Sequence, residues 1–359
     1  QEKLKKAISQ TEKITGKNLA LPVLSCLLLE AKKNSLIIKA TNLELGVEVE
    51  IPVKTEEEGI LTVSGHVLAS FVNTIKNDTS IFLETKENNL KVSTKHSSTL
   101  IKTTTSEDFP LIPKVSQDVE FSIDPQHFIT GLKSVWYAAA AQSMRPELSS
   151  ILVSCDGEYL IFAATDSFRL AEKKIQTKTK QFDPILIPYK NIQEIVRILG
   201  EADKKVEVRA NKNQISFMFD GVHLVSRIID GVFPDYKQII PQEFKTEIVV
   251  LKEDFINTLK VANIFSDKFN QISFSIKTKE KVCEVKSLNA DVGESTNTLD
   301  ATIKGEDIVI SFNYKYITDC FQSIATDTVV ISFNGSNKPA IIKPFNDTSF
   351  TYLVMSTNR

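Results

Sequence analysis

The sequence is poor in the residues from which metal sites, disulfides and phosphate-binding loops are built. Its 359 residues include 12 glycines, 4 cysteines and 4 histidines. The cysteines form no CxxC pair, and the histidines have neither the HExxH nor the HxH spacing of metal ligands. No GxxxxGK[ST] or GxGxxG motif opens a helical pattern, so the common nucleotide sites have no support. We therefore expect no metal and no cofactor, and we expect the cysteines to be small buried residues in a reducing compartment.

Signatures of a catalytic nucleophile are missing too. There is no GxSxG motif, and no cysteine stands in a recognisable nucleophile pattern. Asp166 and Arg169 are a conceivable catalytic pair, but an Asp in a tight turn and an Arg that braces a loop explain both residues. The sequence therefore indicates a protein that is not an enzyme.

Long apolar runs are also absent. No uninterrupted apolar stretch approaches the ~18 residues that span a bilayer, and no charged-then-apolar leader begins the chain. With 42% hydrophobic and 25% charged residues, the composition is that of a soluble globular protein, and we expect a cytoplasmic one. The net charge of -2 means that any affinity for nucleic acid must come from local sorting of charge.

What the sequence does contain is one short pattern in three copies. The clearest copy is residues 164–170, ATDSFRL, which follow a hairpin turn at Asp156-Gly157. The other copies are residues 40–46, ATNLELG, and 287–293, SLNADVG. We call these three segments the cassettes. A pattern repeated at a near-constant spacing indicates one fold unit present three times.

Each repeat is expected to hold two helices. Apolar residues at i, i+3, i+4 and i+7 mark the second helix of every repeat. They are Leu68, Phe71, Val72 and Ile75, then Ile192, Ile195, Val196 and Leu199, then Ile317, Cys320, Phe321 and Ile324. Alternating strands bounded by turn residues lie around these helices. We predict an α+β fold of three repeated domains, each with two helices and an antiparallel sheet, at residues 1–117, 118–243 and 244–359.

Positive charge is concentrated on the expected helices. These are residues 1–17, 64–76, 126–145, 188–199, 252–270 and 314–325. Together they carry a net charge of +7 in a chain of -2, so the remainder carries -9. If the helices share one face, that face is basic and suits a phosphate backbone; the alternative is that surface helices merely scatter their charge.

Six segments in one order carry a family resemblance. They are residues 21–24 (LPVL), 40–46, 145–148 (RPEL), 165–170, 231–236 (GVFPDY) and 352–355 (YLVM). Together with the triple repeat, they are similar to the bacterial sliding clamp, the beta subunit of the replicative DNA polymerase III holoenzyme, over essentially the whole chain. The departures are a first domain that is expected to lack its first strand, a tail that reads STNR after Met355, and Phe168 where His is common.

The resemblance implies a DNA sliding clamp, a non-enzymatic processivity factor. Two chains would form a head-to-tail homodimer, each chain being half of a pseudo-sixfold ring that encircles duplex DNA of any sequence. The replicative polymerase, the clamp loader and repair proteins would dock through short linear motifs.

The resemblance also implies a peptide-binding pocket around the middle cassette. Its residues would be Leu148, Thr165, Ser167, Phe168, Arg169, Leu170, Pro234, Ile239, Tyr316, Pro339, Leu353 and Met355. Most of them are apolar and a few are polar, which is the composition of a ligand cleft. Without the resemblance, the same residues would be assigned to core between domains.

Two further surfaces follow from the resemblance. The DNA-facing residues would be Lys5, Lys6, Lys13, Lys17, Lys133, Arg145, Lys190 and Arg197. Solvated lysines with no such role are the alternative. At the dimer interface, Ile264 and Phe265 would meet an edge strand around Ile101 of the other chain; ordinary core packing is the alternative.

Two other functions remain open on the sequence alone. One is a peptide-binding repeat scaffold that does not encircle DNA, and the other is an enzyme with a site at a repeat junction. Basic helical faces favour the clamp over the scaffold, and the missing catalytic signatures count against the enzyme.

Overall fold

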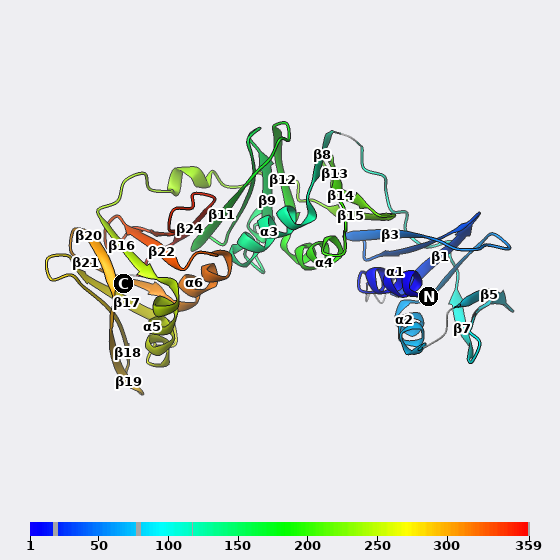
Figure 1. The fold of residues 1–359 in the computed structure, drawn as a ribbon, viewed down its shortest axis with the longest axis horizontal. Coiled ribbons are helices and arrows are strands. Elements are labelled where there is room, and N and C mark those ends of the chain that lie inside the picture. The colour runs from blue at the N-terminus through cyan, green and yellow to red at the C-terminus, as the bar shows by residue number, and fades with distance from the viewer. Residues whose placement is uncertain (17–20, 77–79, 117, 358–359) are drawn as a thin grey trace. The chain divides into compact units, whose positions relative to one another are not determined.

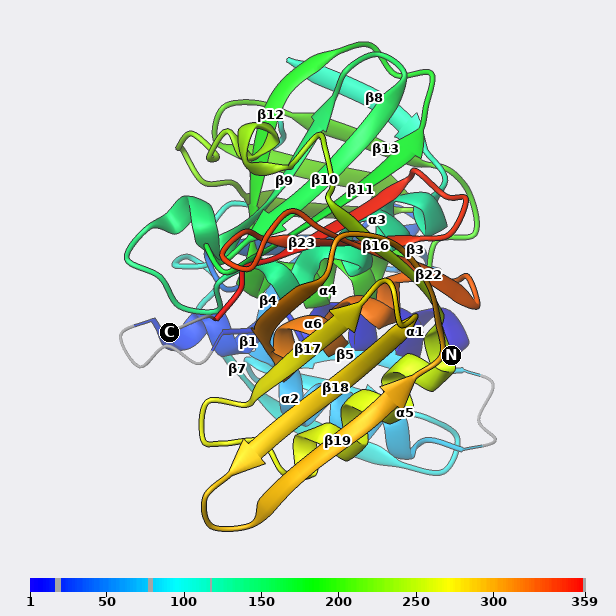
Figure 2. The same ribbon diagram turned by 90° about the vertical axis from the view of Figure 1, so that its left-hand side faces the viewer.

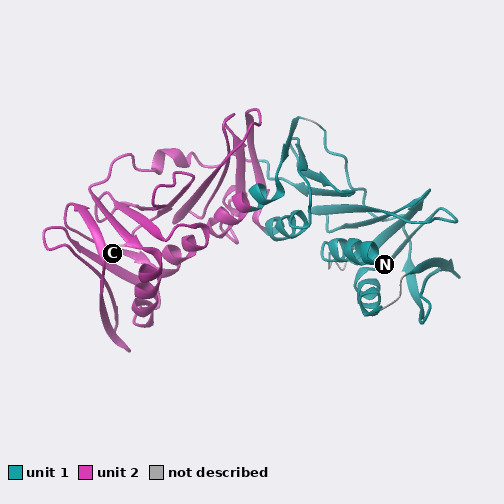
Figure 3. Cartoon of the chain, viewed as in Figure 1, with its two compact units in different colours: residues 1–129, 190–230 teal, residues 130–189, 231–359 magenta. Residues whose placement is uncertain are grey.

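The computed structural model describes residues 1–16, 21–76, 80–116 and 118–357. They form two compact units, shown in Figure 3. Unit 1 consists of residues 1–129 and 190–230, and unit 2 of residues 130–189 and 231–359. The division passes through the middle repeat, so that repeat contributes to both units.

Unit 1 is built on one sheet of eleven strands. Its helices are α1 (Glu2–Glu12), η1 (Pro22–Ser25), α2 (Gly65–Thr74), α4 (Tyr189–Leu199) and the start of α3 (Pro125–Val135). Its strands are β1 (Cys26–Lys32), β2 (Ser35–Thr41), β3 (Leu45–Pro52), β4 (Gly59–Ser64), β5 (Phe82–Lys86), β6 (Asn89–Ser93), β7 (Ser98–Thr104), β8 (Val119–Ile123), β13 (Val206–Ala210), β14 (Gln214–Phe219) and β15 (Val222–Arg227). Their order is β5-β6-β7-β4-β1-β2-β3-β15-β14-β13-β8, and Figure 1 shows α1 and α2 beside each other on one side of it.

Unit 2 contains two sheets. Its helices are the rest of α3, η2 (Trp136–Ala138), η3 (Pro146–Ser149), η4 (Tyr236–Ile239), α5 (Lys252–Ile264), α6 (Tyr314–Thr318) and η5 (Asp319–Ser323). Its strands are β9 (Ser150–Cys155), β10 (Tyr159–Thr165), β11 (Arg169–Gln176), β12 (Phe182–Pro188), β16 (Thr246–Leu251), β17 (Gln271–Lys277), β18 (Val282–Asn289), β19 (Gly293–Leu299), β20 (Ala301–Gly305), β21 (Ile308–Asn313), β22 (Thr328–Phe333), β23 (Ala340–Pro344) and β24 (Phe350–Val354). The sheet orders are β12-β9-β10-β11-β24-β23-β22-β16-β20 and β19-β18-β17-β21. Figure 2 shows β17, β18 and β19 side by side, with α5 along them.

The repeats are joined by the strands that follow the cassettes. β3 follows the first cassette and pairs with β15, the last strand of the second repeat, from Gly46 opposite Val225 to Val49 opposite Val222. β11 follows the second cassette and pairs in the same way with β24, the last strand of the third repeat. The strand after a cassette therefore continues the sheet into the next repeat.

The predicted apolar stripes are buried except at Phe71 and Val196, which are half-buried. Leu68, Val72 and Ile195 are all nearly inaccessible to solvent, and so are the members of the third stripe. Alternating burial along β2 and β17 reflects the two-residue period of a strand with one face on the core. Asp124 caps α3: its Oδ1 accepts from the backbone N–H of Gln126 at 2.8 Å.

The expected helix lengths are wrong at several ends. α1 ends at Glu12, α3 at Val135 and α5 at Ile264, and the third repeat's second helix is one short α-helix continued by η5. Lys13, Arg145 and Lys268 therefore lie beyond helix ends. α1 holds three lysines and two glutamates, so the helices carry less positive charge than the longer segments suggested.

One glycine lets α3 approach its sheet closely. A Cβ at Gly131 would lie 2.3 Å from the ring of Phe162, a core residue of β10. Because no real Cβ sits that close, Gly131 is required for this packing. The four cysteines are buried and free, as expected.

Candidate functional site

The second cassette is a four-residue turn between β10 and β11. Asp166 Oδ1 accepts from the backbone N–H groups of Phe168 (2.9 Å) and Arg169 (3.0 Å). Thr165 Oγ1 donates to the carbonyl of Arg169 at 2.7 Å and accepts from the N–H of Ser167. Ser167 has φ +77°, a left-handed conformation that these side-chain contacts hold.

The first cassette forms the same turn. Asn42 Oδ1 accepts from the N–H groups of Glu44 (3.0 Å) and Leu45 (2.8 Å). Thr41 Oγ1 donates to the carbonyl of Leu45, and Leu43 has φ +74°. The sequence repeat is thus a repeat of hydrogen-bonded structure.

The third cassette departs from this pattern. Asn289 pairs directly with Gly293 across a three-residue loop. In the first two cassettes the residue after the Asn or Asp has positive φ, whereas here the positive φ is at Gly293. Asn289 Nδ2 donates to the carbonyl of Ser266 at 2.8 Å, which ties this hairpin to the end of α5. Asn289 Oδ1 still accepts from the N–H of Asp291 at 3.0 Å. The expectation of three equivalent cassettes is wrong for the third, because Leu288 stands where the other two have Thr41 and Thr165 and offers no hydroxyl to close the same turn.

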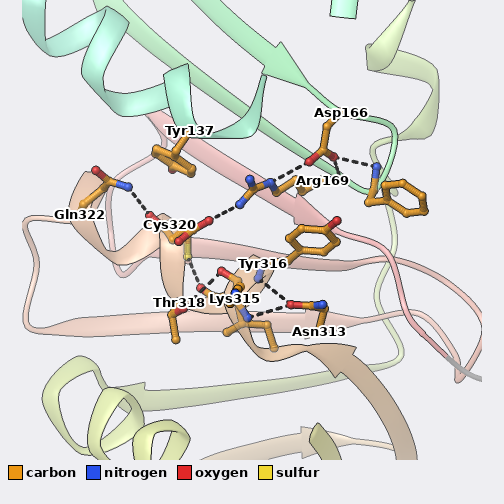
Figure 4. A network of polar contacts seen from close by, with 12 residues as sticks. Tyr137, Asp166, Arg169, Asn313, Lys315, Tyr316, Thr318, Cys320 and Gln322 are labelled. Atoms are coloured by element: carbon orange, nitrogen blue, oxygen red, sulfur yellow. Dashed lines mark hydrogen bonds and ion pairs between the residues drawn. The ribbon is translucent and has the colours of Figure 1, made fainter. Parts of the chain in front are cut away.

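Arg169 is the centre of a polar network in unit 2 (Figure 4). Its Nε donates to Asp166 Oδ2 at 3.0 Å, and its Nη1 donates to Asp319. Its guanidinium lies 4.7 Å from the ring centre of Tyr316. The expectation that Asp166 forms a turn and Arg169 braces a loop is confirmed.

This arginine stays charged although it is largely buried. Burial alone would lower the pKa of Arg169, but Tyr352 and the carboxylates of Asp319 and Asp166 raise it above its ordinary value. Burial also raises the pKa of Tyr316, with a further contribution from Asp166. The network therefore holds one fixed positive charge beside an aromatic ring.

An aromatic stack stands next to this charge. The rings of Phe168 and Tyr316 lie 6.1 Å apart at 21° to each other. Below them, Tyr352 Oη donates to the carbonyl of Tyr316 at 2.5 Å. Met355 is attached to the same turn, since its N–H donates to the carbonyl of Phe168 at 2.8 Å.

A row of paired residues forms the floor of this region. Thr165 lies opposite Leu170 in the ladder, and Leu170 lies opposite Leu353 on β24. Paired residues of an antiparallel ladder share a face, so the three side chains lie side by side. All three are buried, Leu170 with 1% of its surface exposed.

The twelve predicted pocket residues all belong to unit 2, but they differ in accessibility. Ser167, Phe168 and Ile239 are exposed; Arg169, Pro234, Tyr316, Pro339 and Met355 are half-buried; Leu148, Thr165, Leu170 and Leu353 are buried. Only the first two groups can contact a ligand without rearrangement. Their assignment to a pocket stays a prediction.

Sequence reasoning missed Asp319, Tyr352 and Tyr137 as parts of this region. Asp319 lies 150 residues after Arg169, and no local pattern joins the two. Tyr137 lies 6.1 Å from the ring of Tyr352 and accepts from Ser323 Oγ at 3.1 Å. They come from η2, η5 and β24, and only the tertiary structure brings these elements to β11.

The predicted DNA-facing residues of unit 1 are used in different ways. Lys5 donates to the carbonyl of Ile75 at 2.7 Å, and Arg197 donates to Glu194 (2.6 Å) and to the carbonyl of Gln10 (2.9 Å). Both are thus tied to neighbouring helices. Lys6 reaches Glu201 at 3.9 Å and Lys190 reaches Glu44 at 3.1 Å, but both side chains remain more than half exposed.

The remaining basic residues are more accessible. Lys13 and Lys133 are exposed, and their side chains make no hydrogen bond or ion pair with a described residue. In unit 2, Arg145 is exposed beside Glu147 at 2.9 Å. Lys17 lies outside the described residues. None of these positions is contradicted as a DNA contact, so all stay predictions.

The predicted dimer residues also differ in how exposed their side chains are. Ile264 is 65% exposed at the end of α5, and Phe265 is half-buried. Ile101 is buried within unit 1, so it cannot meet another chain through its side chain. Its strand β7 lies between β6 and β4 rather than at the end of the sheet, because β4 pairs with its last residues, Thr103 and Thr104. Over residues 98–102, however, β7 has a ladder partner among the described residues on the β6 side alone.

The structure also shows what lies outside this region. A cavity of about 360 Å³ in unit 2 is lined by Asp267 and by residues of β17, β18 and β19, and by none of the twelve predicted residues. Within the described ranges, no group of three or more His, Cys, Asp or Glu is placed to hold a metal ion. Nor does any helix in those ranges combine the length and apolarity needed to cross a membrane.

Comparison with solved structures identifies the fold. The DNA polymerase III beta subunit of Thermotoga maritima is 27% identical, with a TM-score of 0.93 over 100% of this chain and 98% of that one. The sliding clamp of Pseudomonas aeruginosa is 24% identical, with a TM-score of 0.95 over the same shares. The α+β fold of three clamp domains is thereby confirmed.

Comparison of sequences agrees. Proteins named beta sliding clamp from Staphylococcus epidermidis and Staphylococcus aureus are each 26% identical over 358 residues, which covers 97% of this chain and 95% of those proteins. The family models for the DNA polymerase III beta subunit match in order: the N-terminal domain at residues 1–113, the central domain at 122–235 and the C-terminal domain at 237–358. The chain therefore belongs to the family of the DNA polymerase III beta subunit, the bacterial beta sliding clamps.

Proposed function

We propose that this chain is the DNA sliding clamp of a bacterial replicase: a ring-forming, non-enzymatic processivity factor that works in the cytoplasm. The observation that carries the proposal is the triple repeat, whose three copies match the three domain models of one clamp family in order. A closed ring cannot leave the duplex sideways, so weak and sequence-independent phosphate contacts are enough. We infer domain boundaries near residues 117 and 244.

Ring closure follows from the way the repeats are joined. β3 and β11 each pair with the last strand of the next repeat. β19 stands at the same place after the third cassette, but it is the edge strand of its sheet. The last strand of the first repeat is β7, and its residues 98–102 correspond to residues 222–226 of β15. On β15 these residues pair with β3, whereas on β7 the same side has no partner among the described residues. We infer that β19 of one chain pairs with β7 of another, which gives a head-to-tail homodimer.

Exposed apolar residues support this closure. Leu288 and Val292 flank the β18–β19 hairpin tip near Ile264, and Leu100 is exposed on β7. Large apolar side chains gathered at two unpaired strand edges are typical of an interface. Leu288 and Val292 are thus added to Ile264 and Phe265, and Leu100 replaces Ile101 as the facing residue.

The topological proposal has a direct test. We expect the protein, once loaded, to stay on nicked circular plasmid and to slide off the same plasmid after linearisation. Size-exclusion chromatography with light scattering should give the mass of two chains. A protein that binds peptides but is not retained on circular DNA would instead be the repeat scaffold.

The exposed basic residues are expected to contact DNA phosphates. Replacing Lys13, Lys133 and Lys190 with Glu should weaken retention equally on every sequence. The slope of log K against log salt concentration should flatten by about 0.9 for each phosphate that the variant no longer neutralises. A matched triple variant, Lys95→Glu, Lys178→Glu and Lys279→Glu, changes the same charge at exposed lysines outside the helices and should leave the slope unchanged. Equal slopes for both variants would mean that the chosen lysines do not face the duplex.

We further propose that polymerase, clamp-loader and repair proteins bind at the second cassette. An exposed aromatic stack, a fixed guanidinium and an apolar floor suit a short segment with Leu or Phe anchors and a polar lead residue. Met355 offers a polarizable side chain that adapts to different anchors.

Replacing Phe168 with Ala or Ile239 with Asp should weaken binding of a fluorescent Gln-Leu-x-Leu-Phe-type peptide at least about tenfold, because each removes an exposed apolar contact. Leu251→Asp alters an exposed apolar residue elsewhere in unit 2 and is the control. Fluorescence anisotropy titration measures all three. If Phe168→Ala and Ile239→Asp bind as tightly as Leu251→Asp, the pocket lies elsewhere.

A further inference from the structure

The segment that closes the second repeat is longer than its counterpart in the first. Residues 109–113 read FPLIP, whereas residues 233–241 read FPDYKQIIP. The four additional residues, DYKQ at 235–238, include Tyr236. The longer segment is present only at the junction that carries the proposed peptide site.

This segment is attached to the rest of the chain by one hydrogen bond. Tyr236 Oη donates to Glu172 Oε2 at 2.5 Å. Between Gly231 and Gln242, no other hydrogen bond to a described residue outside the segment is formed; the remaining bonds, such as Gln238 to Asp235 and Gln242 to the carbonyl of Ile240, are internal. Tyr236 and Glu172 are both buried, and the ring of Phe233 packs edge-on against Tyr236 at 6.0 Å.

The bond lies on the face of β11 that forms the floor of the site. Side chains two residues apart on a strand point to the same face, so Glu172 lies on the face of Leu170. Leu170 pairs with Thr165 and Leu353, and these three form the floor row. Tyr236 is therefore attached one side-chain position away from that row, and it belongs to the one-turn helix η4, which ends at Ile239.

We propose that Tyr236 and Glu172 are positioning residues for peptide binding: their buried hydrogen bond fixes the segment of Pro234 and Ile239 over the floor row. This inference rests on the proposed peptide-binding function. A hydrogen bond to a buried carboxylate is among the stronger kinds, and it is directional, so it fixes both the distance and the angle of the segment. Without it, the segment keeps the packing of the buried Phe233 and Tyr236 and the electrostatic attraction of Lys237 to Asp156, neither of which is directional.

The first junction provides a natural comparison. Glu48 lies on β3 where Glu172 lies on β11, 124 residues later. With no tyrosine in the shorter segment, Glu48 is paired instead with His223 (3.8 Å) and Lys39 (3.3 Å). Glu172 also contacts a lysine of its own strand, since Lys174 Nζ lies 3.4 Å from Oε1, while Tyr236 bonds to Oε2. The acidic position is thus paired within the sheet at both junctions, and the inserted segment adds a hydrogen bond at the second.

The test compares four proteins with the fluorescent peptide: wild type, Tyr236→Phe, Glu172→Gln and Glu48→Gln. Tyr236→Phe removes only the hydroxyl and should weaken binding roughly threefold to thirtyfold, the range seen when a residue acts on a site through another. Glu172→Gln keeps an oxygen that accepts the tyrosine hydroxyl and should bind nearly as wild type. Glu48→Gln changes the equivalent position at the other junction and should leave affinity unchanged.

A second measurement reports the position of the segment without any ligand. Lys237 is exposed within it, so the rate of tryptic cleavage after Lys237 should rise in Tyr236→Phe and not in Glu48→Gln. Urea unfolding of each variant separates a loosened segment from a general loss of stability.

The outcomes are distinct. Weaker binding with faster cleavage in Tyr236→Phe alone supports the inference. Wild-type affinity in Tyr236→Phe, or an equal loss in Glu48→Gln, overturns it while the proposed function stands. A wild-type protein that does not bind the peptide overturns the proposed function and this inference together.

Discussion

Replacing Ile264 and Leu288 with Asp is expected to convert the protein to a monomer. Both side chains are largely exposed in the single chain, at 65% and 68%, so their replacement should leave the fold intact. In the proposed dimer they are covered by the first repeat of the other chain. Burying one large apolar side chain contributes about 1.5–3 kcal/mol, and burying an unpaired carboxylate opposes association further.

The effect is doubled by symmetry. A head-to-tail dimer has two identical interfaces, so each substitution acts twice on closure. The expected result is a single-chain mass by light scattering at submicromolar concentration, together with loss of retention on nicked circular plasmid. Phe265 is a poorer choice for this test, because it is half-buried against its own repeat near Gly293.

Val309→Asp is the matched control for this prediction. Val309 is also apolar and 61% exposed, and it lies on β21, the opposite edge of the same four-stranded sheet. It should remain dimeric and be retained on circular DNA. A dimeric double variant, or a monomeric control, would contradict the assignment of the interface to the β19 edge.

The second large effect is expected at Asp166. Asp166→Ala removes two hydrogen bonds to backbone N–H groups and one ion pair to Arg169, whose side chain is only 12% exposed. Each such bond contributes about 0.5–1.5 kcal/mol, and a bond between charged groups contributes more, so we expect a loss of about 2–4 kcal/mol in the stability of unit 2. The turn that presents Phe168 should also lose its shape, and peptide affinity should fall with it.

Two variants separate these contributions. Asp166→Asn keeps the turn, as the natural Asn42 does in the first cassette, and removes only the charge opposite Arg169. Asn42→Ala removes the same two backbone contacts in unit 1, where no ion pair is involved, and should cost about 1–2 kcal/mol without affecting the peptide. Urea denaturation and peptide titration of the three variants measure both effects. If Asp166→Ala is no more harmful than Asn42→Ala, the ion pair with Arg169 contributes little.

Local patterns in the sequence were sufficient for the repeated architecture. The apolar stripes predicted the core-facing side of the second helix in each of the three repeats, because helix period and burial are properties of short segments. The cassettes predicted a tight turn with Asp166 in it, because Asp, Asn and Thr bond to backbone groups two to four residues away. Helix ends were less predictable: α1 and α5 stop several residues early, where no capping residue marks the end.

The accessible part of the site was decided by the tertiary structure alone. Composition could not show that Leu170, which lies opposite Leu353 in the ladder, is buried while Ile239 is exposed. Nor could it show that Ile101 faces its own core while the neighbouring Leu100 faces outward, since a one-residue change in strand register reverses every side chain.

The sequence by itself determined the three repeats, their helices and the turn at the centre of the second one, because each depends on contacts within a few residues. The partners of Arg169 and Tyr236 were decided only by the tertiary structure. Asp319 is 150 residues from Arg169, and Glu172 is 64 residues from Tyr236. Arg169 and Glu172 lie on β11, whereas Asp319 and Tyr236 lie on η5 and η4, and no local propensity encodes which segments far apart in the chain come together.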